Sequence, residues 1–177
     1  MALSGEPPLD HAYNDSKEPL TLLESWDVAT KHLNFRASVL EQWNATAKDG
    51  HGPIDAYIAP LNANVGIPHD DNKRVGYMGY TGTVNTLDFT SCTIPVTFID
   101  PEIDLADDPS GEFDAAGQPI PPPVSDLDKT VRANYDPGRF KGLPVTVQVV
   151  CRRLEEEKVM AIAQVLYQLL KTGGSTT

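Results

Sequence analysis

Positive charge and long apolar runs are both scarce in this chain of 177 residues. It holds 14 lysines and arginines against 25 aspartates and glutamates, which gives a formal net charge of -11 at pH 7. Binding to nucleic acid needs a clustered basic face, so a nucleic-acid partner is not expected. No apolar run approaches the roughly 20 residues of a membrane span, so no transmembrane segment is expected. The N-terminus has neither a basic region nor an apolar core, and we predict no signal peptide.

Cysteine is scarce as well, since Cys92 and Cys151 are the only two. Two cysteines do not make the disulfide framework of a small secreted protein. We interpret them as reduced thiols of the core rather than as a disulfide. This interpretation predicts a cytoplasmic location.

The spacings that hold metals or nucleotides are missing. The run His-Asp-Asp at 69–71 has no i,i+4 or Cys-x-x-Cys spacing, so we interpret it as a loop and predict no metal site. Gly76, Gly79 and Gly82 recur every three residues, which is not the Gly-x-Gly-x-x-Gly pattern of dinucleotide sites. We therefore predict no cofactor.

Motifs that present a nucleophile are missing too. There is no Gly-x-Ser-x-Gly elbow, and the Gly-Gly-Ser run at 173–175 has no following helix to hold it. Cys92 follows Ser91 in an apolar stretch, which favours an inert buried thiol over a nucleophile paired with His51 or His69. No catalytic residue is predicted in the chain.

What the sequence does contain is a regular β-α unit over 142–171. Residues of one parity mark a strand: Val145, Val147, Val149 and Cys151. From Leu154 the apolar residues recur every three or four positions, which predicts a helix with glutamates in its first turn and Lys171 in its last. Units of this kind belong to layered α/β folds.

The remaining elements are predicted in the same way. We expect helices over 20–43 and 127–133, a short helical turn over 83–89, and strands over 54–60 and 92–98. Thr21 and Glu24 match a capping box at the start of the first helix. Trp26 and Trp43 of that helix are expected to pack in the core.

The segment at about 100–128 carries most of the acidic excess and a proline-rich run at 119–123. Such a segment has little apolar surface with which to offset the cost of ordering. It also lacks the Asp-x-Asp-x-Asp-Gly spacing of an EF-hand loop. We expect a flexible surface excursion.

Two stretches of the chain resemble one family. The first is Gly-Leu-Pro-Val-Thr-Val-Gln-Val-Val at 142–150, followed by Arg-Arg-Leu-Glu-Glu-Glu-Lys-Val at 152–159. The second consists of seven matching residues: Tyr80, Thr81, Asn85, Leu87, Asp88, Pro95 and Val96. Together they resemble the C-terminal end of the amidase-signature hydrolases, particularly fungal general amidases and fatty-acid amide hydrolases. Thr146 and Cys151 stand where the family usually has glycine.

The resemblance implies an α/β fold with a partial mixed β-sheet flanked by helices, as in the C-terminal part of the family's α/β/α sandwich. It covers about 4–170, but only the C-terminal third of the family's catalytic unit. We therefore expect residues 1–177 to form a single incomplete amidase-like domain. Its strands would lack neighbours, and exposed sheet edges of this kind favour self-association.

The resemblance also implies a chemistry. The family hydrolyses carbon-nitrogen amide bonds through a serine activated by a second serine and a lysine, with a Gly/Ser-rich loop that stabilises the oxyanion. This sequence contains neither the Gly-Ser-Ser-Gly-Gly loop nor the upstream lysine strand, so we expect no activity from the chain alone. Four residues would form the wall of the substrate pocket on its acyl side: Tyr80, Thr83, Val84 and Leu87. Ordinary packing between helix and sheet is favoured for Leu87 and stays open for Tyr80.

The sequence thus predicts the C-terminal part of an amidase, which contributes sheet and pocket wall. It would take a small-molecule amide only when completed by an N-terminal amidase segment. We favour a truncated gene over a split enzyme as the origin of the chain. The alternative function is a non-catalytic binding or interaction module derived from an amidase.

Overall fold

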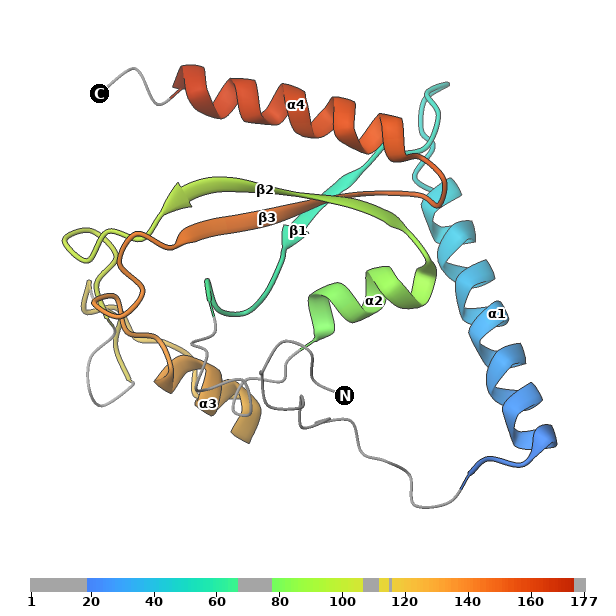
Figure 1. The fold of residues 1–177 in the computed structure, drawn as a ribbon, viewed down its shortest axis with the longest axis horizontal. Coiled ribbons are helices and arrows are strands. Elements are labelled where there is room, and N and C mark those ends of the chain that lie inside the picture. The colour runs from blue at the N-terminus through green and yellow to red at the C-terminus, as the bar shows by residue number, and fades with distance from the viewer. Residues whose placement is uncertain (1–18, 67–77, 107–111, 115, 174–177) are drawn as a thin grey trace, which may run out of the picture.

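The computed structural model describes residues 19–66, 78–106, 112–114 and 116–173 (Figure 1). Within them the elements follow in this order: α1 (Leu22–Asn44), β1 (Tyr57–Pro60), α2 (Gly79–Leu87), β2 (Thr90–Phe98), α3 (Asp126–Ala133), β3 (Pro144–Cys151) and α4 (Glu156–Gly173). The predicted helices and strands are confirmed with shifted ends. The turn expected over 83–89 is part of the longer helix α2, and the strand expected from residue 54 begins only at Tyr57.

Strand β3 is the centre of the sheet. Among the described strands the order is β1-β3-β2, and both neighbours are antiparallel to β3. Val149 is the register partner of Ile58 on β1 and of Cys92 on β2. The predicted α/β class is confirmed, but the parallel pairing of a mixed sheet does not occur among these three strands, because β3 separates β1 from β2. β1 and β2 are both edge strands in this part of the chain.

Helix α4 covers one face of the sheet (Figure 1). The buried core between them consists of Ile94, Val149, Cys151, Val159 and Ala163. Val149 and Cys151 alternate along β3, and Ile94 is the register partner of Val147 on the same side of the sheet. The two helix residues are four positions apart, so each element presents one apolar side to the other. This arrangement confirms the β-α unit predicted at the end of the chain.

The opposite face of the sheet is held by a buried amide. Gln148 is 1% exposed, and its Nε2 donates to the carbonyl oxygen of Pro60 at 3.0 Å and to that of Tyr80 at 3.2 Å. A buried amide without partners is costly, so these two bonds stabilise one arrangement of the three segments. Gln148 thereby joins the centre of β3 to the end of β1 and the start of α2.

Helix α1 begins with the predicted capping box, since Thr21 and Glu24 exchange the two expected hydrogen bonds. Near its other end Trp43 is buried, and its Nε1 donates to the carbonyl oxygen of Ile54 at 2.8 Å. Its ring contacts Tyr57 and Phe89, with centroids 5.8 and 5.4 Å away. The core position predicted for Trp43 is therefore confirmed.

The core position predicted for Trp26 is wrong. This side chain is 60% exposed, although it lies on the apolar side of α1 that the sequence pattern defines. Helical spacing identifies residues that share a side, but it does not say whether a partner covers that side. α1 contacts the rest of the described chain through a neighbouring side, so Trp26 is left outside the core.

The described residues of the 100–128 segment contain local hydrogen bonds. Asp114 accepts from the backbone of Ala116 and Gln118 at 2.9 and 2.7 Å, and Phe113 forms an isolated bridge with Pro119. Tyr135 reaches back from beyond α3 and donates through its hydroxyl to the carbonyl of Asp104. None of the helices among the described residues is long and apolar enough to cross a membrane.

We predict that Gln148→Met lowers the free energy of unfolding by about 1–3 kcal/mol, because the backbone carbonyls of Pro60 and Tyr80 lose a buried donor while the side-chain volume is kept. Urea denaturation would measure the change. The matched control is Gln164→Met on the exposed side of α4, for which a change within about 0.5 kcal/mol is expected. Equal effects of the two substitutions would show that the two hydrogen bonds contribute nothing.

Candidate functional site

Helix α2 carries the four residues that the sequence analysis places at a pocket wall. Its C-cap, Asp88, has a left-handed conformation with φ 58°, and the next amide, that of Phe89, donates to the carbonyl of Val84. This helix end turns the chain directly into β2. Because Gln148 also holds the carbonyl of Tyr80, the helix is tied to the sheet at both ends.

The four residues do not share one environment. Val84 and Leu87 are 5% and 4% exposed and belong to the buried interior. Thr83 is exposed, and its hydroxyl donates to the carbonyl of Gly79 at 3.1 Å within the same helix. Tyr80 is 37% exposed at the first turn. Tyr80 and Leu87 lie seven residues apart, which is about 10 Å along a helix, so they face different surroundings.

Tyr80 lines a pocket of about 250 Å³ between the start of α2 and α3. The other lining residues are Ala63, Val124, Ser125, Leu127, Asp128 and Val131. Most of these side chains are apolar, as in pockets that accept small organic molecules. The pocket therefore suits an apolar group of modest size, with the tyrosine at its wall.

The carboxylate in this pocket is already paired. Asp128 accepts two hydrogen bonds from Arg132, both at 3.0 Å, and one from the backbone of Val124 at 2.9 Å. The Arg132 guanidinium, followed by the Val124 amide, lowers the pKa of the Asp128 carboxyl below its ordinary value of 3.8. The Asp128 carboxylate thus stays ionised and holds the first turn of α3 to the backbone of Val124. An ionised carboxylate has no proton to give, so Asp128 is not suited to act as a general acid near neutral pH.

The α3 side of this pocket was missed by the site prediction. The sequence analysis assigned Val124 and Leu127 to the excursion or its border rather than to a site. A local signal was present, because Ser125 stands three residues before Asp128, and the Ser125 side chain accepts from the Asp128 amide as an N-cap. The approach of α3 to α2 depends on tertiary structure, so no local pattern indicates it.

Leu87 lines a different groove, of about 360 Å³, near the turn from β3 to α4. Its other lining residues are Arg36, Ala37, Leu40, Phe89, Arg152, Arg153 and Glu155. Asp88 lies between two of these arginines, 2.6 Å from Nε of Arg153 and 3.5 Å from Nη2 of Arg36. These ion pairs connect α1, the end of α2 and the turn between β3 and α4.

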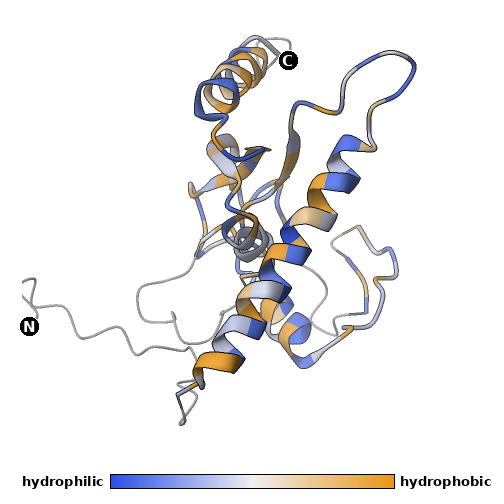
Figure 2. Ribbon diagram, turned by 90° about the vertical axis from the view of Figure 1, so that its right-hand side faces the viewer, coloured by the Kyte–Doolittle hydropathy of each residue, from blue (hydrophilic) through white to orange (hydrophobic). Residues whose placement is uncertain are grey.

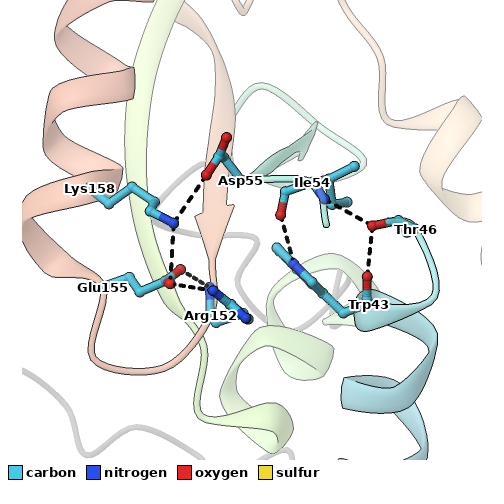
Figure 3. Close-up of polar contacts among 7 residues, drawn as sticks. All are labelled: Trp43, Thr46, Ile54, Asp55, Arg152, Glu155 and Lys158. Carbon is cyan, nitrogen blue, oxygen red and sulfur yellow. Dashed lines mark hydrogen bonds and ion pairs between the residues drawn. The ribbon is translucent and has the colours of Figure 1, made fainter. Parts of the chain in front are cut away.

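A polar cluster lies beside this groove (Figure 3). Lys158 of α4 donates to Asp55 at 3.1 Å and to Glu155 at 3.3 Å, and Arg152 donates to Glu155 at 2.8 Å. Burial opposes ionisation of Glu155, but the hydrogen bonds from Arg152 and then Lys158 outweigh it and hold the pKa of this carboxyl below 4.5. Hydrogen bonds to Asp55 and then Glu155 raise the pKa of Lys158 above 10.5. The cluster ties α4 to the segment that leads into β1.

The two thiols are poor candidates for chemistry. Burial raises the pKa of the Cys151 thiol above 9.0, and the nearby Glu155 carboxylate adds to this effect. Both cysteines are free, Cys151 buried and Cys92 partly buried. Residues 69–71 lie outside the described part of the chain. Within the described part, no group of three or more histidines, cysteines, aspartates or glutamates is placed to hold a metal ion.

Both the fold and the sequence resemble those of known amide hydrolases. The fold resembles part of a solved fatty acid amide hydrolase, with a TM-score of 0.68 and 23% identity, over 86% of this chain and 24% of that one. An acetamidase of Emericella nidulans is 35% identical over 173 residues, which are 96% of this chain and 29% of the relative. An acetamidase of Aspergillus oryzae is 35% identical, and "Amidase 1" of Gibberella moniliformis is 30% identical, covering 94% and 96% of this chain. No family model matches the chain.

The fold is thus the α/β fold of part of an amide hydrolase. The chain is similar to the C-terminal part of these amidases, and its fold matches that of the fatty acid amide hydrolase. It spans less than a third of the length of the curated relatives named here, with 29%, 29% and 30% of each covered.

We predict that acid removes the contribution of Glu155 to stability. Its folded-state pKa is below the ordinary 4.5, so the ionised form stabilises the fold above that pH, and the effect is lost as the pH falls below 4.5. Glu155→Gln should therefore lower the free energy of unfolding by about 1 kcal/mol at pH 7 and by much less near pH 3. Urea denaturation at both pH values measures this.

Glu157→Gln, an exposed change in the first turn of α4 two residues after Glu155, is the control. A deficit of the Glu155 variant that is equally large at both pH values would contradict the role given to its charge.

Proposed function

We propose that this chain is the C-terminal part of an amide-hydrolysing enzyme and forms the acyl side of its substrate pocket. The observation that carries the proposal is the 35% identity to an acetamidase over 96% of the chain. The pocket beside Tyr80 supports it, because an apolar pocket on a rigid helix suits the acyl group of an amide.

In the proposed reaction, a serine oxygen attacks the amide carbonyl, the amine leaves with a proton, and water then releases the acid from the acyl-enzyme. The serine pair, the lysine and the oxyanion donors would come from an N-terminal amidase segment. The residues of this chain would bind and orient the acyl group. Tyr80 and Thr83 on the exposed side of α2 would contact the acyl group. Val84 and Leu87 on its buried side would hold the helix in place. The chain alone is expected to be inactive.

Two further expectations belong to this proposal. Without its partner segment, the chain would self-associate through the free edges of β1 and β2, which offer unpaired backbone groups to another strand. A cytoplasmic location is supported by the free state of Cys92 and Cys151.

Complementation tests the function. We would co-express this chain with the part of the Emericella nidulans acetamidase that it does not match, and measure hydrolysis of acetamide and of a long-chain fatty amide. Activity is expected only when both parts are present. The control is the same pair with the nucleophilic serine of the acetamidase part replaced by alanine.

Hydrolysis by the 177-residue chain alone would overturn the proposal that the nucleophile lies outside it. An inactive pair with a stable, monodisperse chain would instead favour the alternative function, a non-catalytic binding module. Binding of an amide to that chain, measured calorimetrically, would then identify the module.

In the active pair, we predict that Tyr80→Ala lowers kcat/KM for the long-chain amide by roughly tenfold, which corresponds to about 1.4 kcal/mol of lost contact. The backbone carbonyl that accepts from Gln148 is unchanged by this substitution. Asn85→Ala, an exposed change elsewhere on α2, is the control and should leave kcat/KM within about twofold. An unchanged kcat/KM for the Tyr80 variant would remove this residue from the pocket wall.

A further inference from the structure

Helix α1 has an uncovered apolar side. Six uncharged residues form this side, which we name the α1 stripe: Leu22, Trp26, Ala29, Leu33, Ala37 and Leu40. The exposed fractions of Leu22, Trp26, Leu33 and Leu40 are 65%, 60%, 64% and 44%. Figure 2 shows the helix crossing the molecule with hydrophobic segments in successive turns. Contiguous apolar surface of this kind marks an interaction site more often than scattered exposed residues do.

The stripe borders the rest of the chain at one end, where Ala37 and Leu40 line the groove beside Leu87, but it is not the main attachment of α1. The helix is attached through a neighbouring side, on which His32 Nε2 contacts the carbonyl of Thr86, Arg36 pairs with Asp88, and Trp43 is buried. His32 precedes Leu33 by one residue, so the two side chains point about 100° apart around the helix. The capping box at Thr21 fixes the free end. The stripe is therefore held rigidly and presented outward.

The occupant of the stripe must be apolar where it touches the helix, because all six stripe residues are uncharged. The self-association proposed above would use the free edges of β1 and β2, so it does not supply an occupant for the stripe. The relatives point to another occupant. They contain this segment within chains more than three times as long, since only 29% of each acetamidase is covered.

We propose that the α1 stripe is the docking surface for the N-terminal part of the amidase, whether that part is on the same polypeptide or on a separate one. This inference rests on the proposed function. It adds that the α1 stripe holds the two parts together, in addition to any contacts at the pocket and the sheet edges. The rigid α1 would then fix the position of the N-terminal part relative to α2 and the proposed pocket.

The test uses the co-expressed pair, with an affinity tag on the acetamidase part. Leu33→Glu places a charge at the centre of the stripe, and we expect at least a tenfold loss of this chain from the purified complex. Val28→Glu is the matched control, because Val28 is also exposed, at 54%, but lies on a different side of α1. Its recovery should stay within twofold of the unchanged chain. Circular dichroism of each variant alone would verify that α1 remains folded.

Oxidative footprinting with mass spectrometry gives an independent readout at Trp26. We expect Trp26 to be oxidised in the isolated chain and at least fivefold less in the complex, while the buried Trp43 is protected in both. Equal oxidation of Trp26 in both states would overturn the proposal. A dimer of the isolated chain in sedimentation, with Trp26 already protected, would also overturn it and assign the stripe to a second copy.

The outcomes separate this inference from the proposed function. A complex that depends on Leu33 but hydrolyses no amide would support the docking surface and refute the function. An active pair whose recovery is unaffected by Leu33→Glu would support the function and refute the docking surface.

Discussion

The structure depends on the complete desolvation of the second half of β3. This strand is paired on both sides, and Gln148, Val149, Val150 and Cys151 are all 1% exposed or less. An amide in that position must find partners inside the protein, and Gln148 finds them in the carbonyls of Pro60 and Tyr80. One buried side chain thus sets the position of α2 on the sheet. The hydrogen bond from Gln148 to the Tyr80 carbonyl therefore also positions the proposed pocket wall.

The remaining helices are attached by interactions at the ends of elements. Trp43 connects α1 to the chain that leads into β1, and the ion pairs of Asp88 connect it to the turns beside β2 and β3. Lys158 and Asp55 hold α4 to the same segment. These contacts leave much apolar surface of α1 exposed, together with both sheet edges. This exposed apolar surface supports the proposed completion of the fold by an N-terminal amidase part, since the chain spans only 29% of the Emericella nidulans acetamidase.

Periodicity predicted most of the fold. The alternation in β3 and the spacing in α4 follow from which residues must face a core, and the structure places Val149 and Val159 there. The same reasoning was right for Trp43 and wrong for Trp26, although both lie in one helix. The difference is that Trp43 meets Tyr57 and Phe89, whereas no described residue covers Trp26. For the pocket, the residues of α2 were named from the resemblance, but Leu127 and Val131 of α3 were not.

By itself the sequence determined the α/β class, the order of the elements and the relationship to amidases, because these depend on local spacing and on motifs such as Gly-Leu-Pro-Val at 142–145. Only the tertiary structure decided that β3 lies between β1 and β2, that Tyr80 and Leu87 line separate pockets, and that α3 lines one of them. The physical reason is that these features arise from contacts between residues far apart in the chain. Gln148 shows this best, since its two acceptors lie 88 and 68 positions away.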